Sequence, residues 1–185
     1  MYLSQLSIAS PVRPHPSISV PTAAEVWVVD TSSITEVRRR MSREDQRKVY
    51  QSLTTLVNAN HLVFPVQVKN ELKRWASPTG DDPPLQWTES VEDRAASNPE
   101  WATVAEVLAQ VPEVLDPDKT AGAEEADPYV LARALELKRN GRDVTIITEE
   151  KTNKPRKLSL STAAGILKLP AVTMLPFLKS QGLLP

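Results

Sequence analysis

Short runs of β-branched and aliphatic residues, separated by long helical stretches, constrain the fold of this chain more than any other feature of its sequence. These runs are residues 26–29 (Val-Trp-Val-Val), 62–64 (Leu-Val-Phe) and 144–147 (Val-Thr-Ile-Ile). Continuous apolar runs of this length suit parallel strands that are covered on both faces. Residues 171–173 (Ala-Val-Thr) could form a last short strand.

Apolar positions with helical spacing fill most of the chain between these runs. We expect helices from Ser42 to about 57, from Pro65 to about Trp75, and over about 88–97, 100–110, 123–139, 161–168 and 174–181. Residues 77–86, rich in proline and aspartate, are expected to form a loop. This alternation predicts a three-layer α/β/α domain with a central, mostly parallel sheet and right-handed crossovers.

The composition supports one folded domain preceded by a tail. Residues 1–24 hold four prolines among serines without a sustained period, so we expect a flexible tail there and a single domain over 25–185. The chain has 185 residues, of which 41% are hydrophobic, enough for a substantial core. It has no cysteine, which excludes disulfides and thiolate zinc sites.

The charge and hydropathy patterns limit the partners of the protein. The net charge of −1 is no global signature of nucleic-acid binding, so any basic surface must be local. No apolar run approaches the roughly 20 residues that span a bilayer, and the N-terminus lacks the layout of a signal peptide. We therefore expect a soluble, cytoplasmic protein with no membrane association.

Carboxylates follow two of the predicted strands. Asp30 ends the first strand, and Thr148-Glu149-Glu150 ends the third. Ligand sites of open parallel sheets form beyond the carboxyl ends of the strands, so these acids should lie at one edge. A helix or turn cap is the simpler role for Asp30, and Ser32 or Ser33 could share it.

Two further acids lie on the apolar faces of predicted helices. Glu71 shares a face with Val68, Leu72 and Trp75, and Asp127 shares one with Val130, Leu131 and Ala134. A carboxylate on a buried face is costly unless it is paired or holds a metal. A buried ion pair is an equally good account of Glu71 alone, but the four acids together favour a cation site.

The four acidic motifs, in this order and context, resemble those of PIN-domain ribonucleases, in particular the VapC-like toxins. The resemblance rests on the strand entering Asp30-Thr31-Ser32, on Glu71, on Asp127 in Asp-Pro-Tyr-Val-Leu-Ala and on Val-Thr-Ile-Ile-Thr-Glu-Glu, and it runs from about Val26 to Leu184. Glutamate replaces the usual aspartate of the fourth motif. Either Glu149 or Glu150 could fill that position, and the register favours Glu150. Glu125, about 200° from Asp127 on a helix, is expected to point elsewhere, although some related families also have an acid at this position.

The resemblance implies a metal-dependent endoribonuclease that leaves 5′-phosphate and 3′-hydroxyl ends. Asp30, Glu71, Asp127 and Glu150 would be its catalytic acids and metal ligands, with Ser32 and Thr148 orienting carboxylates from behind. Oxygen ligands select hard cations such as Mg²⁺ or Mn²⁺, and whether one or two ions bind stays open.

Basic residues lie beside the acidic motifs and are candidate RNA contacts. They are Arg38, Arg39 and Arg40 after the first motif, Lys69, Lys73 and Arg74 around Glu71, and Lys151, Lys154, Arg156 and Lys157 after the fourth. Such clusters suit phosphate binding, although basic helix surfaces are usually only solvated. The four tryptophans are expected in the core or at an interface rather than as base-stacking platforms.

The same resemblance suggests partners and alternatives. The compact PIN toxins imply a toxin–antitoxin pair, with a cognate antitoxin over the acidic pocket, and a homodimer with its interface near 88–110. The alternative is a catalytically inactive PIN fold that binds nucleic acid or serves as a scaffold. A structure-selective DNA nuclease would need an arch or clamp and more acids. A phosphatase of the haloacid dehalogenase type would need aspartate at Ser32.

Overall fold

A four-stranded parallel sheet forms the centre of the computed structural model, which describes residues 25–76, 80–119 and 125–184. The strands β1 (Glu25–Val29), β2 (Leu62–Val63), β3 (Asp143–Ile147) and β4 (Ala171–Val172) lie in the order β2-β1-β3-β4. All three pairings are parallel, and Val29 is in register with Ile147. The central strands β1 and β3 therefore end side by side.

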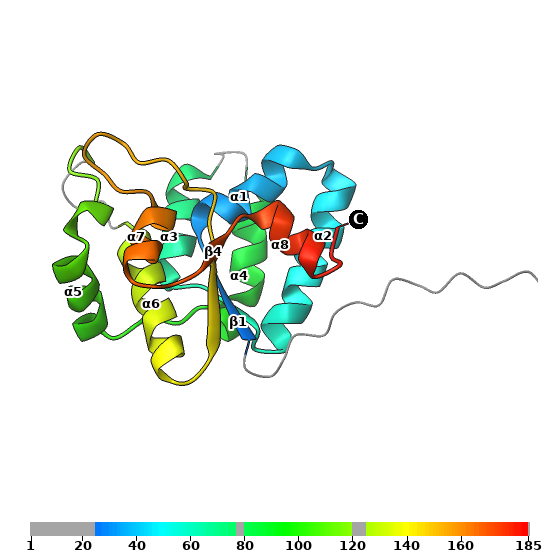
Figure 1. Cartoon of the computed structure of the whole chain (residues 1–185). Helices are drawn as coiled ribbons and strands as arrows, with labels where there is room; N and C mark the ends of the chain where they lie inside the picture. The colour runs from blue at the N-terminus through cyan, green and yellow to red at the C-terminus, as the bar shows by residue number, and fades with distance from the viewer. Residues whose placement is uncertain (1–24, 77–79, 120–124, 185) are drawn as a thin grey trace, which may run out of the picture.

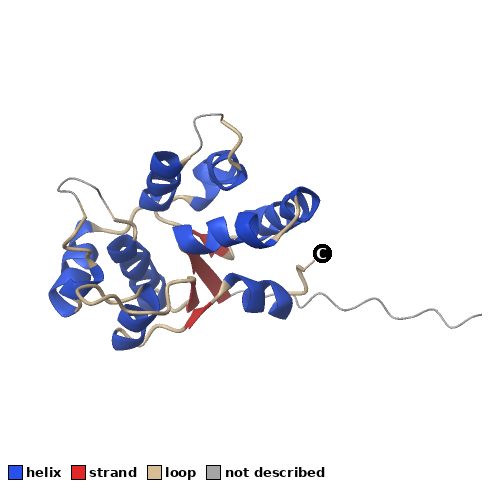
Figure 2. Ribbon diagram, turned by 90° about the horizontal axis from the view of Figure 1, so that it is seen from above, coloured by secondary structure: helices blue, strands red, loops and turns tan. Residues whose placement is uncertain are grey.

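Helices cover both sides of this sheet, so the expected three-layer α/β/α architecture is confirmed (Figures 1 and 2). The helices are α1 (Thr31–Arg40), α2 (Arg43–Asn58), α3 (Val66–Trp75), α4 (Pro83–Ala95), α5 (Trp101–Gln110), α6 (Asp127–Arg139), α7 (Leu160–Ile166) and α8 (Met174–Ser180), with a 3₁₀ turn at Pro112–Val114. The side chains of β1 beyond Glu25 are buried, as expected of a strand covered on both faces.

Specific packing joins the layers around β1. The Trp27 ring lies 5.1 Å from that of Phe177 on α8, and the Tyr50 ring of α2 stacks on Trp87 of α4 at 5.5 Å. Tyr50 also donates a hydrogen bond to the carbonyl oxygen of Ile34, which fixes α2 against α1. These contacts hold α1, and with it the end of β1, in one position.

Three expectations about the helices were wrong. Helix α1 was not predicted, although the helix-cap role considered for Asp30 is confirmed: Asp30 caps α1 and accepts hydrogen bonds from the next two backbone N–H groups. The predicted loop at 77–86 is in part the start of α4, because Asp82 caps that helix and two prolines fit its first turn. Helix α6 begins at Asp127 rather than at about 123.

The remaining predicted elements agree with the structure to within a few residues. Ser42 caps α2 as expected, by accepting from the N–H of Asp45. The predicted tail, 1–24, lies outside the described residues. Within the described part of the chain, no helix is long and apolar enough to cross a membrane.

Candidate active site

Asp30 stands at the point where the two central strands end. Its backbone N–H donates to the carbonyl oxygen of Ile147 at 3.0 Å, which continues the β1–β3 pairing by one residue. Its carboxylate accepts from the N–H of Thr31 at 2.7 Å and from the N–H of Ser32 at 3.3 Å. Asp30 is thus the cap of α1 and, at 2% exposure, a buried acid at the carboxyl edge of the sheet.

Two hydroxyl groups orient this carboxylate. Ser32 Oγ donates to Asp30 Oδ2 at 2.6 Å, and Thr148 Oγ1 donates to the same oxygen at 3.2 Å. The hydroxyls in turn accept from backbone: Ser32 from the N–H of Glu149 at 3.0 Å and Thr148 from the N–H of Glu150 at 3.1 Å. The structure therefore gives Ser32 and Thr148 contacts that suit the orienting role predicted for them.

Glu71 joins the starts of two helices. Its Oε2 accepts from Thr31 Oγ1 of α1 at 2.8 Å, and its Oε1 accepts from the N–H of Ala126, just before α6, at 3.2 Å. Arg74 and Lys119 lie near Oε1 at 3.9 and 3.8 Å. Because both oxygens are hydrogen-bonded to protein, Glu71 braces the site and holds Asp30 and Asp127 near each other.

Asp127 and Glu125 share one ammonium group. Lys157 Nζ lies 2.6 Å from Asp127 Oδ2 and 3.5 Å from Glu125 Oε2, and all three residues are buried. The expectation that Glu125 points elsewhere was wrong. It assumed a helix through both residues, but α6 begins only at Asp127, so the helical angle between them does not apply.

The structure separates the two candidates for the fourth acid. Glu149 Oε1 accepts from the N–H of Met174 at 2.7 Å and so serves the start of α8. Glu150 Oε2 lies 3.5 Å from Lys157 Nζ, on the same ammonium as Asp127. Glu150 is therefore the acid of this pair that the fold brings to the cluster.

The acids act on one another electrostatically. Burial, with added repulsion from Glu150 and Glu71, raises the pKa of Asp30 to about 6 despite the Ser32 hydrogen bond. Burial, with repulsion from Asp30 and Glu150, raises the pKa of Asp127 to about 8 although Lys157 opposes the rise. Burial lowers the pKa of Lys157, but Asp127 and the neighbouring carboxylates more than reverse this and raise it overall. Perturbations of this size are typical of functional sites.

The chemistry of the cluster suits a hard cation. Its ligands are all oxygens, as Mg²⁺ and Mn²⁺ prefer. Two buried oxygens, Glu125 Oε2 and Asp127 Oδ2, have only ammonium groups as partners among the described residues, and Lys157 Nζ lies 2.6 Å from Asp127 Oδ2. Among the described residues, however, no three acids are arranged so that they could hold one metal ion. Lys157 Nζ instead pairs with three of the acids, Glu125, Asp127 and Glu150.

Most of the basic residues predicted to bind RNA have carboxylate partners. Arg38 pairs with Asp82 at 2.6 Å, Arg39 and Arg40 both pair with the buried Glu36, and Lys69 pairs with Glu92. The three arginines after the first motif are therefore paired with an acid of their own helix or with the residue that caps α4.

The other basic residues differ in their partners. Lys154 pairs with Asp116 and Arg156 pairs with Asp118. Lys73 is exposed, and Arg74 lies beside Glu71 as described above.

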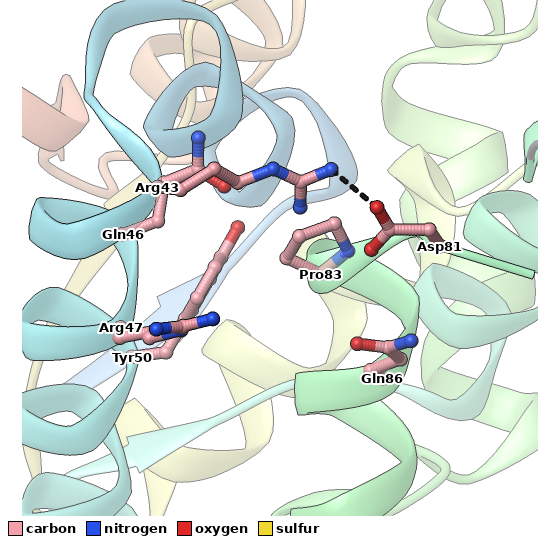
Figure 3. A pocket seen from close by; sticks show the side chains of 7 residues that line it. All are labelled: Arg43, Gln46, Arg47, Tyr50, Asp81, Pro83 and Gln86. Atoms are coloured by element: carbon pink, nitrogen blue, oxygen red, sulfur yellow. Dashed lines mark hydrogen bonds and ion pairs between the residues drawn. The ribbon is translucent and has the colours of Figure 1, made fainter.

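An open depression of about 230 Å³ adjoins the acids. Its lining includes Glu149 and Glu150 together with Lys151, Lys154 and Lys157. A second hollow, of about 220 Å³, lies between α2 and the start of α4 (Figure 3). Its one acid, Asp81, is paired with Arg43 at 2.7 Å, so it offers no cluster of carboxylates.

The tryptophans divide between the core and the surface. Trp27 and Trp87 are buried, as expected, whereas Trp75 and Trp101 are 64% and 67% exposed. The placement of Trp75 on the apolar face of α3 was therefore wrong. Trp75 is the last residue of α3 and reaches past the end of the packed stripe.

Sequence reasoning underrated Lys157 and did not foresee the bracing role of Thr31. Lys157 was grouped with its exposed neighbours in the basic segment after Glu150, and nothing in the local pattern separates it from them. Thr31 directly follows Asp30, which the sequence already indicated as a candidate site residue. Its contact with Glu71 depends on the packing of α1 against α3, which local spacing does not reveal.

Comparison with known proteins places these residues within one family. A family model described as "Domain of unknown function (DUF4411)" matches residues 27–184, a range that contains every acid of the cluster and Lys157. No curated protein matches the chain.

Proposed function

The chain belongs to the DUF4411 family, a domain of unknown function, and we propose that it is a metal-dependent endoribonuclease that hydrolyses RNA phosphodiester bonds. One observation carries the proposal. Asp30, Asp127 and Glu150 come from two strand ends and a helix start, yet they lie close enough that Glu150 raises the pKa of both aspartates and Asp30 raises the pKa of Asp127. A fold gains nothing in stability from crowding buried acids, so a positively charged ligand such as a divalent cation accounts for the arrangement.

In this proposal Asp30, Asp127 and Glu150 would hold Mg²⁺ or Mn²⁺. Such an ion lowers the pKa of a bound water and offsets charge on a phosphodiester. Ser32 and Thr148 keep the Asp30 carboxylate in one orientation, and Glu71 keeps the starts of α1 and α6 together. The protein supplies a preorganised acidic pocket at the edge of the sheet.

The proposed reaction consumes one water molecule. Its oxygen forms the new bond to phosphorus, and the bond from phosphorus to the 3′ oxygen breaks. One proton of the water ends on the 3′ oxygen and the other is released, which leaves 5′-phosphate and 3′-hydroxyl ends. The lysine-lined depression beside Glu150 suits the phosphate backbone of the RNA.

By its resemblance to PIN toxins, we further propose that the protein is the toxin of a toxin–antitoxin pair. A cognate antitoxin would then cover the acidic pocket and suppress cleavage. Homodimerisation is part of the same proposal. Co-purification of the chain with the product of a neighbouring gene, and loss of cleavage in that complex, would support this setting.

A second function has one observation in its favour. Lys157 already neutralises part of the cluster, and no three described acids are placed to hold a metal. This arrangement suits a catalytically inactive PIN-like protein that binds nucleic acid through its basic segments or serves as a scaffold.

A cleavage assay separates the two functions. Purified wild-type protein and Asp30→Asn are incubated with end-labelled single-stranded and structured RNAs, in Mg²⁺, Mn²⁺ or EDTA. We expect wild-type cleavage with either metal, none in EDTA and none by Asp30→Asn. RNA binding without cleavage by the wild-type protein in every metal would replace the nuclease with the binding protein.

A further inference from the structure

Lys157 is a buried cation held by three acids. Its side chain is 6% exposed, and Nζ lies 2.6 Å from Asp127, 3.5 Å from Glu125 and 3.5 Å from Glu150. The neighbouring basic side chains, Lys154 and Arg156, are 68% and 67% exposed. Lys157 alone among these three turns inward, toward the acids that we propose as metal ligands.

The backbone around Lys157 is fixed by hydrogen bonds. The N–H of Lys154 donates to the carbonyl oxygen of Lys157 at 2.9 Å, and the N–H of Leu158 donates to that of Glu113 at 2.8 Å. Asn153 Oδ1 accepts from the N–H of Ser159 at 2.9 Å. These three hydrogen bonds fix the backbone of the short turn and so hold the Lys157 side chain in position. The fold therefore sets the contact between Lys157 and Asp127.

The charges of the cluster point to a single metal ion. Five carboxylates of described residues lie in it, those of Asp30, Glu71, Glu125, Asp127 and Glu150. Within the described part of the chain, ion pairs bring three cations to these acids, namely Arg74, Lys119 and Lys157. When all five acids are ionised, the described residues of the cluster keep two negative charges, and one divalent cation would neutralise these.

Lys157 also faces the space that a substrate could enter. It lines the open depression together with Glu150, Lys151 and Lys154. Lys157 and Glu150 therefore belong both to the acidic cluster and to the lining of this accessible hollow. A phosphate in that hollow would meet a desolvated positive charge, which acts more strongly than a charge in water.

We propose that Lys157 is a catalytic residue whose ammonium group contacts the phosphate that is cut and takes the place of a second divalent cation. The site then works with one metal ion. This inference rests on the proposed ribonuclease function. The four acids alone would need a second metal ion to neutralise charge on the phosphate, and we assign this role to Lys157.

The test compares Lys157→Gln and Lys157→Arg with the wild-type chain, and Lys48→Gln makes the same change at an exposed lysine on α2 as a control. Electron paramagnetic resonance counts the Mn²⁺ ions bound per chain, and single-turnover cleavage of labelled RNA gives the rate. We expect the wild-type protein to bind one Mn²⁺. Lys157→Gln should bind Mn²⁺ more tightly, because a competing cation is gone, yet cleave roughly 100-fold more slowly. Lys157→Arg should regain most of that rate.

Removing Lys157 leaves buried acids without a counter-charge, so Lys157→Gln could fail to fold. The double variant Lys157→Met with Glu125→Gln removes one charge of each sign and carries the same expectations.

Other outcomes overturn the proposal. Two Mn²⁺ ions on the wild-type protein would remove the need for a lysine in that role. Faster cleavage by Lys157→Gln would make Lys157 a plug, and an unchanged rate with reduced stability would make it structural. A wild-type protein that neither binds Mn²⁺ nor cleaves RNA would instead contradict the proposed ribonuclease function. The measurements on the wild-type protein alone therefore distinguish failure of that function from failure of the proposal for Lys157.

Discussion

Asp30 combines two roles that can be separated by mutation. As the cap of α1 it needs an oxygen acceptor, and as a proposed metal ligand it needs a negative charge. We expect Asp30→Asn to keep the cap and lose cleavage, because asparagine is as good an N-cap as aspartate. Asp30→Ala should lose cleavage and also about 1 kcal/mol of stability. Urea unfolding and the cleavage assay on both variants check this. Equal destabilisation by both would contradict the cap assignment.

Thr31 provides a direct test of the brace that Glu71 forms. Its hydroxyl donates to Glu71 Oε2 at 2.8 Å in a buried setting. Thr31→Val keeps the shape but removes the donor to a charged group, so we expect a loss of about 1.5–3 kcal/mol in unfolding free energy. Thr35→Val on the same helix removes a hydroxyl that bonds only to its own backbone turn, and should cost less. Equal costs would mean that Glu71 does not join the helices.

The raised carboxyl pKa values predict how stability depends on pH. Asp30 and Asp127 take up protons more readily in the folded state than their ordinary value of 3.8, with pKa values of about 6 and 8. Their contribution to stability is therefore complete below about pH 4 and is lost as pH rises through 6 and 8. In EDTA the melting temperature should fall from pH 5 to pH 9. Added Mn²⁺ should restore more of it at pH 9 than at pH 5. A melting temperature that rises over this range in EDTA would contradict these shifts.

At the scale of single elements, proline and aspartate near positions 77–86 were the hardest signals to interpret. Asp-Asp-Pro-Pro is common in loops, but it is equally the start of a helix when the aspartate caps and the prolines occupy the first turn. The tertiary contact that decides the matter is the ion pair between Arg38 and Asp82, far apart in sequence. Helix α1 was missed for a related reason, since Thr-Ser-Ser favours turns unless a cap such as Asp30 is in place.

The start of α4 gives a prediction at this scale. Asp82 is 3% exposed, accepts from the N–H of Leu85 and pairs with Arg38. We expect Asp82→Ala to destabilise the protein by about 1–2 kcal/mol through loss of the cap. Asp82→Asn, which can keep the cap but not the ion pair, should cost less. Both should leave cleavage per folded molecule unchanged. The assignment of the helix start fails if Asn and Ala are equally harmful.

For the whole molecule, the sequence was sufficient to predict the layers, the order of most elements and the two carboxylates at strand ends. The residues at strand ends can be predicted because parallel strands end at a common edge of the sheet. In the structure Asp30 and Thr148, which follow β1 and β3, are hydrogen-bonded to each other. The sequence did not allow us to predict that Lys157 and Glu125 belong to the acidic cluster. The position of Lys157 depends on a turn whose next residue, Leu158, is hydrogen-bonded to Glu113, and the position of Glu125 depends on where α6 begins. Neither feature can be predicted from the residues around each position.

The central claim is that the acids around Asp30 bind a divalent cation, and anomalous scattering from crystals soaked in Mn²⁺ tests it most directly. We predict one anomalous peak per chain in contact with Asp30 and Asp127, and its loss in crystals of Asp30→Asn. A map without such a peak at saturating Mn²⁺, with Lys157 still paired to Asp127, would contradict the account and leave an acidic cluster neutralised by lysine alone.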